Sequence, residues 1–161
     1  GKKTKNLNFI DISLACTNLI QLATVKVPSF TYPNSIIILD GDVKEHKSQL
    51  NSVKKIKNIL LLPSNKSPEQ LLSSFLYNLK DEHFLWNQID ETFDHQFCFQ
   101  EFSYDDIQTD RVAAKKWFNI HLPLWGRNAS KVLNVWKKEN KELVDEFNLN
   151  FDNLLSNIKK D

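Results

Sequence analysis

The sequence predicts an α/β fold in which a small parallel sheet is followed by an all-helical C-terminal part. Two short apolar runs, residues 36–39 and 58–63, alternate with segments of helical character. This order is typical of parallel strands joined by right-handed crossovers. From residue 106 onward, apolar residues recur at helical spacing instead. We expect an α/β part at 1–80 and a mainly helical part at 81–161, together forming one compact unit.

The first half of the chain alternates strand and helix patterns. The run at 36–39 is too apolar for a strand with one wet face, so we expect a central strand that is buried on both faces. Pro63 ends the second apolar run. In chain order the expected elements are a strand at 7–13, a short helix at 14–27, a proline-broken loop at 27–35, a strand at 36–39, a partly helical segment at 44–55 and a strand at 58–63.

A capped helix follows the second apolar run. Ser67 is a good N-cap, Pro68 suits the first helical turn, and Gln70 completes the spacing of a capping box. Beyond it we expect a short helix at 81–89, a strand at 95–102, a helix at 111–120, a break at 121–128 and one long or two consecutive amphipathic helices from 132 to 158.

Composition restricts the kind of protein. No apolar run approaches the ~20 residues that a membrane span needs, and no signal peptide is recognisable, so we expect a cytoplasmic protein. The two cysteines, Cys16 and Cys98, lack metal-ligand spacing. There is no methionine and the chain opens with Gly1, which indicates a fragment of a longer chain.

Charge is segregated although the net charge is only +1. Residues 1–70 carry ten lysines and five acids, and residues 81–110 carry nine acids and no lysine or arginine. Residues 111–161 carry ten basic residues and six acids. Such a chain can present a basic face to nucleic acid, although most of these charges are ordinary solvated surface.

The most informative stretch is SIIILDGDVKEH, residues 35–46, in which an apolar run leads into two aspartates. Functional groups of parallel α/β sheets gather just past the C-terminal ends of strands, where Asp40 and Asp42 are expected. Residues i and i+2 of an extended chain share a side, and Gly41 between them removes side-chain bulk. Two converging carboxylates suit Mg²⁺ or Mn²⁺. The alternative is a simple turn, for which Asp and Gly are common residues.

Several stretches in order along the chain resemble the TOPRIM-type C-terminal region of OLD-family ATPases, a group that includes anti-phage defence ATPases of the Septu type. The resembling stretches are IDISLACTNLIQLA, VPSF, IIILDGDV, NILLLP, KSPEQLL, FLWN, TDRVAAKKWFN and WG. They cover nearly the whole chain. The resemblance implies a TOPRIM/Rossmann-like sheet and DNA cleavage by divalent metal held in an acidic E…DxD set.

In this resemblance Asp40 and Asp42 match the DxD and would be both catalytic residues and metal ligands. The metal would stabilise charge on the scissile phosphate. The set's glutamate lies upstream of the DxD, but residues 1–39 contain no glutamate, and Asp11 is the sole acid before Asp40. The ATPase half is absent, because the chain has no P-loop pattern.

Basic residues near the aspartates are further candidates. Lys66 follows the second strand and is a candidate catalytic residue that contacts phosphate, or else a loop lysine in solvent. Glu69 follows the same strand and could also face the two aspartates, but the favoured interpretation is a glutamate that complements the helix dipole. Four lysines after the DxD are candidates for a nucleic-acid path, although lysine-rich surface is the commoner explanation: Lys44, Lys47, Lys54 and Lys55.

Three functions remain open. The first is a metal-dependent endonuclease-like domain of an anti-phage ATPase that binds DNA and is oligomeric in the full-length protein. The second is a catalytically silent docking or oligomerisation platform for a partner nuclease, which the missing glutamate favours. The third is a HAD-type phosphotransferase with a D-x-D-x-T/V motif, which Lys44 at the Thr/Val position argues against.

Overall fold

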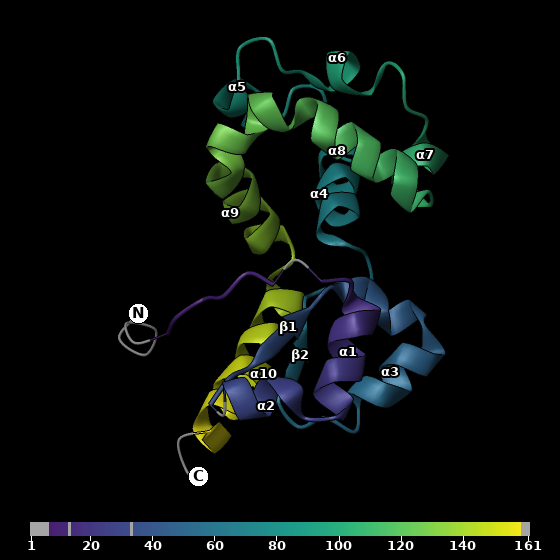
Figure 1. Ribbon diagram of the computed structural model, residues 1–161. Coiled ribbons are helices and arrows are strands. Elements are labelled where there is room, and N and C mark those ends of the chain that lie inside the picture. Colours follow the sequence, from purple (N-terminus) through teal and green to yellow (C-terminus); the bar gives the residue numbers. More distant parts are fainter. Residues whose placement is uncertain (1–6, 13, 33, 159–161) are drawn as a thin grey trace.

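The computed structural model describes residues 7–12, 14–32 and 34–158, and it confirms the predicted fold class. A two-stranded parallel sheet comes early and helices follow. Figure 1 shows two parts: the sheet with α1, α2, α3 and α10, and a group of helices from α4 to α9. Each part has its own hydrophobic core.

The sheet consists of β1 (Ile37–Leu39) and β2 (Ile59–Leu61), paired in parallel with Ile37 opposite Ile59. Leu39 points into a core that also contains Ile20, Val43 and Val53. The elements around the sheet are α1 (Cys16–Thr24), α2 (Val27–Thr31), the 3-10 helix η1 (Gly41–Glu45) and α3 (Lys47–Val53). The strands at 36–39 and 58–63 and the helices at 14–27 and 44–55 are thus confirmed in shortened form.

Other expectations for the α/β part are wrong. Residues 7–12 of the expected strand 7–13 have no regular structure and are mostly exposed, and residue 13 lies outside the described residues. The expected loop 27–35 contains α2, because Pro28 suits a first helical turn. β1 is not buried on both faces: Ile38 is 37 % exposed, since the described sheet has two strands and no element covers that side chain fully.

In the described residues every element after β2 is a helix, and those from α4 to α9 form the helical part (Figure 1). The helices after β2 are α4 (Pro68–Tyr77), α5 (Leu85–Ile89), α6 (His95–Phe99), α7 (Tyr104–Gln108), α8 (Arg111–Trp125), η2 (Gly126–Asn128), α9 (Ala129–Glu139) and α10 (Lys141–Ile158). The strand expected at 95–102 is wrong, because Asp94 caps α6 by accepting a hydrogen bond from the backbone N–H of Phe97.

Side-chain caps define where several of these helices begin. Ser67 caps α4 as predicted, accepting from the backbone N–H of Gln70. The Gln70 side chain does not reach back to complete a capping box, since it donates to the backbone carbonyl of Gln108 instead. Asp110 caps α8, which passes through Pro123 and ends at Trp125, so the break comes at Gly126.

Tryptophans anchor the core of the helical part. Trp117 is fully buried, stacks on Phe99 with ring centroids 4.7 Å apart, and donates its indole N–H to the carbonyl of Cys98 at 2.7 Å. Trp125 and Leu76 are buried in the same core. Because α4, α8 and α6 all contribute, this core fixes the position of α8 relative to α4.

The residues of the two hydrophobic cores are not separated at residue 80, where the sequence predicts the boundary between the α/β part and the helical part. Leu72 and Leu76 of α4 already belong to the helical core. At the other end, Asn140 separates α9 from α10, and α10 returns to pack on β2 (Figure 1). The α/β part is therefore completed by the C-terminal helix. Among the described residues, no helix combines the length and apolar character required to cross a membrane.

Candidate functional site

Asp40 and Asp42 lie directly past the C-terminal end of β1. Asp40 is the N-cap residue of η1 with an extended backbone, and Asp42 lies in its first turn. Both therefore occupy the edge of a parallel sheet where α/β proteins place functional groups, as the sequence predicts. Both side chains are partly buried.

The loop after β2 holds this turn in place. A Cβ atom on Gly41 would lie 2.6 Å from the carbonyl oxygen of Ser64 and 3.0 Å from that of Pro63, so only glycine allows this approach. The ammonium of Lys44 donates to the carbonyls of Leu62 (3.1 Å) and Ser64 (2.7 Å). The turn that carries the two aspartates is thus fixed against residues 62–64.

The helical part supplies a cation to Asp42. Nη1 of Arg111, the first residue of α8, lies 2.7 Å from Oδ2 of Asp42. The Asp42 side chain is 14 % exposed and that of Arg111 is 55 % exposed. The pair therefore joins a sheltered carboxylate to an arginine that remains accessible to solvent.

A second ion pair lies one helical turn further along α8. Nζ of Lys115 is 3.6 Å from Oε1 of Glu69, which belongs to the first turn of α4. We refer to Asp40, Asp42 and Glu69 together as the carboxylate cluster. Two cations on one helix face this cluster, and its three acids come from two separate loop–helix junctions.

The pKa of Asp40 is raised above its ordinary value. Burial of the Asp40 carboxyl is the main cause, followed by the negative charges of Asp42 and Glu69. Arg111 and Lys115 act in the opposite direction and lower this pKa. Burial and the two neighbouring carboxylates thus outweigh the two cations, so the position favours the protonated form of Asp40.

The cluster's fit to a metal ion is limited. Carboxylate oxygens are the ligands that Mg²⁺ and Mn²⁺ prefer, and Mg²⁺ is often held by one or two carboxylates with water and phosphate oxygens. Among residues 7–12, 14–32 and 34–158, however, no three His, Cys, Asp or Glu side chains are arranged to hold a metal ion. Asp40 and Asp42 therefore fit a metal shared with phosphate, and do not form a complete protein cage.

Lys66 is placed differently from the sequence-based expectation. Its ammonium donates to Oγ of Ser74 and to Oε1 of Gln108, each at 2.9 Å, and burial lowers its pKa. Lys66 therefore ties α4 to α7. The residue of this segment whose charge acts on Asp40 is Glu69, for which the sequence favoured a role at the helix dipole over one near the aspartates.

The four lysines that the sequence predicts along a nucleic-acid path lie at two different elements, η1 and α3. Lys44 is engaged with the loop after β2, and burial lowers its pKa while the charge of Glu146 on α10 raises it. Lys47 begins α3 and Lys54 is its C-cap residue, with Lys55 following. These three are exposed at α3, on a different element from the cations that face the carboxylate cluster.

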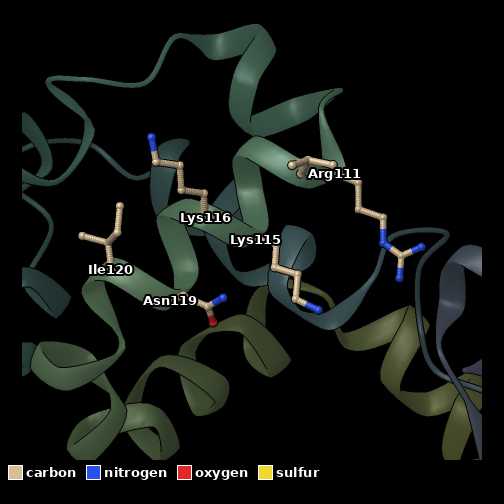
Figure 2. Close-up of a pocket in the computed structure, with 6 residues that line it drawn as sticks. Arg111, Lys115, Lys116, Asn119 and Ile120 are labelled. Carbon is tan, nitrogen blue, oxygen red and sulfur yellow. The ribbon is translucent and has the colours of Figure 1, made fainter. Parts of the chain in front are cut away.

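A shallow, open groove lies along one face of α8 and is lined by side chains of that helix (Figure 2). It has a volume of 680 Å³ and is lined by Arg111, Val112, Lys115, Lys116, Asn119 and Ile120. Arg111 and Lys115 thus contribute both to this groove and to the ion pairs with the carboxylate cluster. The spacing 111, 115, 119 is readable in the sequence as one helical edge, but the sequence alone does not show what that edge faces.

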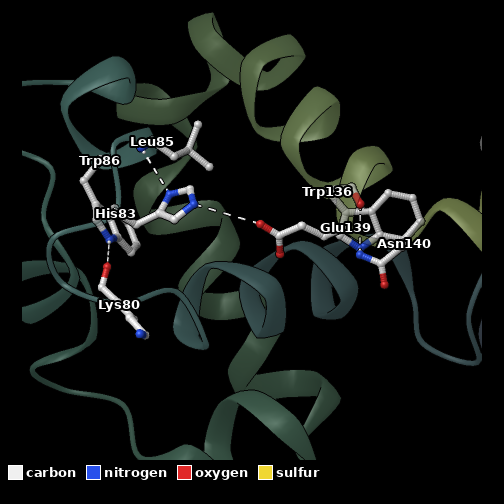
Figure 3. A network of polar contacts seen from close by, with 7 residues as sticks. All are labelled: Lys80, His83, Leu85, Trp86, Trp136, Glu139 and Asn140. Atoms are coloured by element: carbon white, nitrogen blue, oxygen red, sulfur yellow. Dashed lines mark hydrogen bonds and ion pairs between the residues drawn. The ribbon is translucent and has the colours of Figure 1, made fainter.

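A separate polar network joins the C-terminal end of α9 to the segment before α5 (Figure 3). His83 accepts a hydrogen bond at Nδ1 from the backbone N–H of Leu85, and its Nε2 lies 4.0 Å from Glu139. Trp86 donates to the carbonyl of Lys80. These contacts hold helices together and bring no group toward the carboxylate cluster.

No protein-family model, curated protein or solved structure matches this chain significantly.

Proposed function

We propose that this chain is a TOPRIM-like domain that binds a divalent metal and nucleic-acid phosphate at the carboxylate cluster, in a larger anti-phage ATPase. One observation supports the proposal most directly. Three carboxylates and two cations meet past the C-terminal end of β1, where burial and the charges of Asp42 and Glu69 raise the pKa of Asp40. A site of this kind attracts a cation to the acids and a phosphate to the neighbouring cations.

Each residue has a separate role in this proposal. Asp40 and Asp42 would hold Mg²⁺ or Mn²⁺, whose chemistry is to stabilise charge on a phosphate and to activate a water molecule. Arg111 is placed to bind a phosphate oxygen, since a guanidinium pairs with phosphate as well as with carboxylate. Gly41 and Lys44 position the aspartates by fixing their turn against residues 62–64.

The test measures metal binding before activity. Mn²⁺ binding to the chain is followed by titration, together with nicking of supercoiled plasmid DNA in Mg²⁺ or Mn²⁺. The double variant Asp40→Asn/Asp42→Asn is expected to lose both. The matched control is Asp145→Asn/Asp152→Asn, which removes two exposed acids of α10 and is expected to keep both. Equal Mn²⁺ affinity in the two double variants contradicts the metal proposal.

A catalytically silent docking platform is the second candidate. It is favoured by the two ion pairs, since Asp42 and Glu69 already have cationic partners, and by the incomplete ligand set among the described residues. In this case the chain binds no Mn²⁺ and nicks no plasmid, but the intact parent protein co-purifies with a nuclease subunit. The Asp40→Asn/Asp42→Asn variant then leaves that association unchanged.

A further inference from the structure

The groove on α8 combines cations and apolar side chains on one exposed helical face. Arg111, Lys115 and Asn119 follow one another at intervals of four residues, and Figure 2 shows them along one edge of the helix. Lys116 extends from the other edge, where its ammonium lies 5.9 Å from the centre of the Phe102 ring. Of the six described residues that line the groove, three are cationic and none is acidic.

The apolar members of this face are unusually accessible. Val112 is 79 % exposed and Ile120 is 51 % exposed, and they lie near the two ends of the groove. Scattered apolar residues on a surface need no explanation, but these two share one helical face with three cations. A ligand with negative charges at regular intervals and flat apolar groups beside them would use both kinds of side chain.

The groove leads to the carboxylate cluster. Arg111 is bonded to Asp42 and Lys115 lies beside Glu69, so both cations border the groove on one side and the acids on the other. A polyanion in the groove would therefore reach the two cations that also pair with Asp42 and Glu69. Successive turns of an α-helix place side chains about 5–6 Å apart, a spacing comparable with that of neighbouring phosphates in an extended strand.

We propose that the α8 groove is the track for a nucleic-acid backbone, whose phosphates contact Arg111, Lys115 and Lys116. This inference rests on the proposed function, because it names the surface along which nucleic acid reaches the carboxylate cluster. In this inference the α8 groove, and not the lysines of α3, is the main surface that contacts nucleic acid. The choice of nucleic acid over an acidic peptide follows from the exposed apolar residues beside the three cations, because bases can stack on or pack against such side chains.

Three adjacent lysine pairs make a matched experiment possible. Lys115 and Lys116 lie on the groove, Lys54 and Lys55 lie at the end of α3, and Lys137 and Lys138 lie on α9, and all six are exposed. Each pair is changed to glutamine. Binding of a fluorescein-labelled single-stranded oligonucleotide is measured by anisotropy in EDTA over a range of salt concentrations, and circular dichroism verifies that each variant is folded.

We expect Lys115→Gln/Lys116→Gln alone to weaken binding, by roughly tenfold at low salt. The slope of log affinity against log salt should flatten by about 1.4, because each phosphate contact of a single strand contributes ~0.7. An unchanged affinity in this variant overturns the inference. So does an equal loss in the α3 or α9 variant, or stronger binding of poly-glutamate than of the oligonucleotide by the unmodified chain.

The EDTA condition separates this inference from the proposed metal site. If the groove binds the oligonucleotide in EDTA but the chain shows no Mn²⁺ binding, the track stands and the metal proposal fails. If Mn²⁺ binds and the Lys115→Gln/Lys116→Gln variant keeps full oligonucleotide affinity, the metal proposal stands and the track is wrong.

Discussion

The guanidinium of Arg111 lies 2.7 Å from the carboxylate of Asp42, which joins the first residue of α8 to the turn after β1. These two residues belong to the two parts of the molecule, whose hydrophobic cores are separate. The Arg111 side chain is largely exposed, so the pair contributes about 1 kcal/mol or less to stability. Its main effect is on charge: it supplies to Asp42 the positive charge that the proposed metal ion would otherwise supply.

Arg111→Gln is therefore expected to increase the affinity of the carboxylate cluster for Mn²⁺. The substitution frees Asp42 and removes a positive charge from the neighbourhood of Asp40. A charge interaction of about 1 kcal/mol corresponds to a gain of roughly fivefold. Isothermal titration calorimetry with Mn²⁺ measures this change in affinity.

The matched control is Arg127→Gln, because Arg127 is the other arginine of the chain and lies exposed in η2. This variant also removes one positive charge, but from a residue that does not pair with Asp42. Its Mn²⁺ affinity should therefore stay close to that of the unmodified chain. An equal gain in Mn²⁺ affinity in the two variants would point to a general effect of net charge. A lower Mn²⁺ affinity in Arg111→Gln would mean that Arg111 helps the site to bind the metal instead of competing with it.

Asp40→Asn is expected to stabilise the fold at neutral pH. Because the native pKa of Asp40 is raised above its unfolded value of 3.8, the ionised carboxylate costs stability above the native pKa. This cost disappears as the pH falls through the native pKa toward 3.8. Urea unfolding at pH 7, 6, 5 and 4 should give an advantage of about 1 kcal/mol or less at pH 7, which shrinks toward pH 4.

Asp42→Asn provides the comparison for this effect. It removes the same charge two residues away, but it loses the ion pair with Arg111, so no stabilisation is expected. The Asp40 side chain makes no capping hydrogen bond to η1, so asparagine at that position sacrifices no such bond. A lower stability of Asp40→Asn at pH 7 would mean that the carboxylate has a favourable partner beyond Arg111 and Lys115.

Local patterns in the sequence predicted much of the fold. The apolar runs around Leu39 and Leu60 form the parallel strands, and the Ser-Pro-x-Gln pattern begins α4 at Pro68, because these signals act within a few residues. The strand expected at 95–102 is wrong for a related reason: Asp94 is a strong N-cap, and an apparent alternation over a short run does not outweigh it. Residues 7–12 likewise show a strand-like pattern without forming a strand.

The candidate site was predicted only in part. Asp40 and Asp42 follow from the end of β1, which is a local feature. The approach of Glu69 and Lys115 depends on how the core around Trp117 packs α8 against α4, and no short stretch of sequence encodes that packing. Lys66 was expected near phosphate because it follows β2, but its side chain turns to Ser74 and Gln108.

Lys44→Met is expected to destabilise the fold more than Lys47→Met. The Lys44 ammonium donates two hydrogen bonds, to the carbonyls of Leu62 and Ser64, whereas Lys47 is exposed at the first position of α3. Because Lys44 is itself exposed, its two charged hydrogen bonds predict a loss of about 1 kcal/mol, against a change within ~0.5 kcal/mol for Lys47. Urea unfolding measures both; equal effects would mean that the loop after β2 does not depend on Lys44.

Gly41→Ala tests how closely the aspartate turn approaches that loop. The added Cβ would lie 2.6 Å from the carbonyl oxygen of Ser64 and 3.1 Å from that of Leu62, and backbone atoms cannot yield as a flexible side chain can. We expect a loss of roughly 1–3 kcal/mol, the usual cost of overpacking, together with weaker Mn²⁺ binding because Asp40 and Asp42 flank the displaced residue.

Gly126→Ala is the control for this substitution. Its Cβ would meet the side chain of Leu122 at 3.1 Å, which can shift, and its backbone is already helical with φ of −59°. Alanine there restricts the unfolded chain and suits the helix, so stability should change by less than about 1 kcal/mol in either direction. If Gly41→Ala were as harmless as Gly126→Ala, the turn carrying Asp40 and Asp42 could move away from residues 62–64 at little cost. The two carboxylates would then lack the fixed position that metal binding at the carboxylate cluster requires.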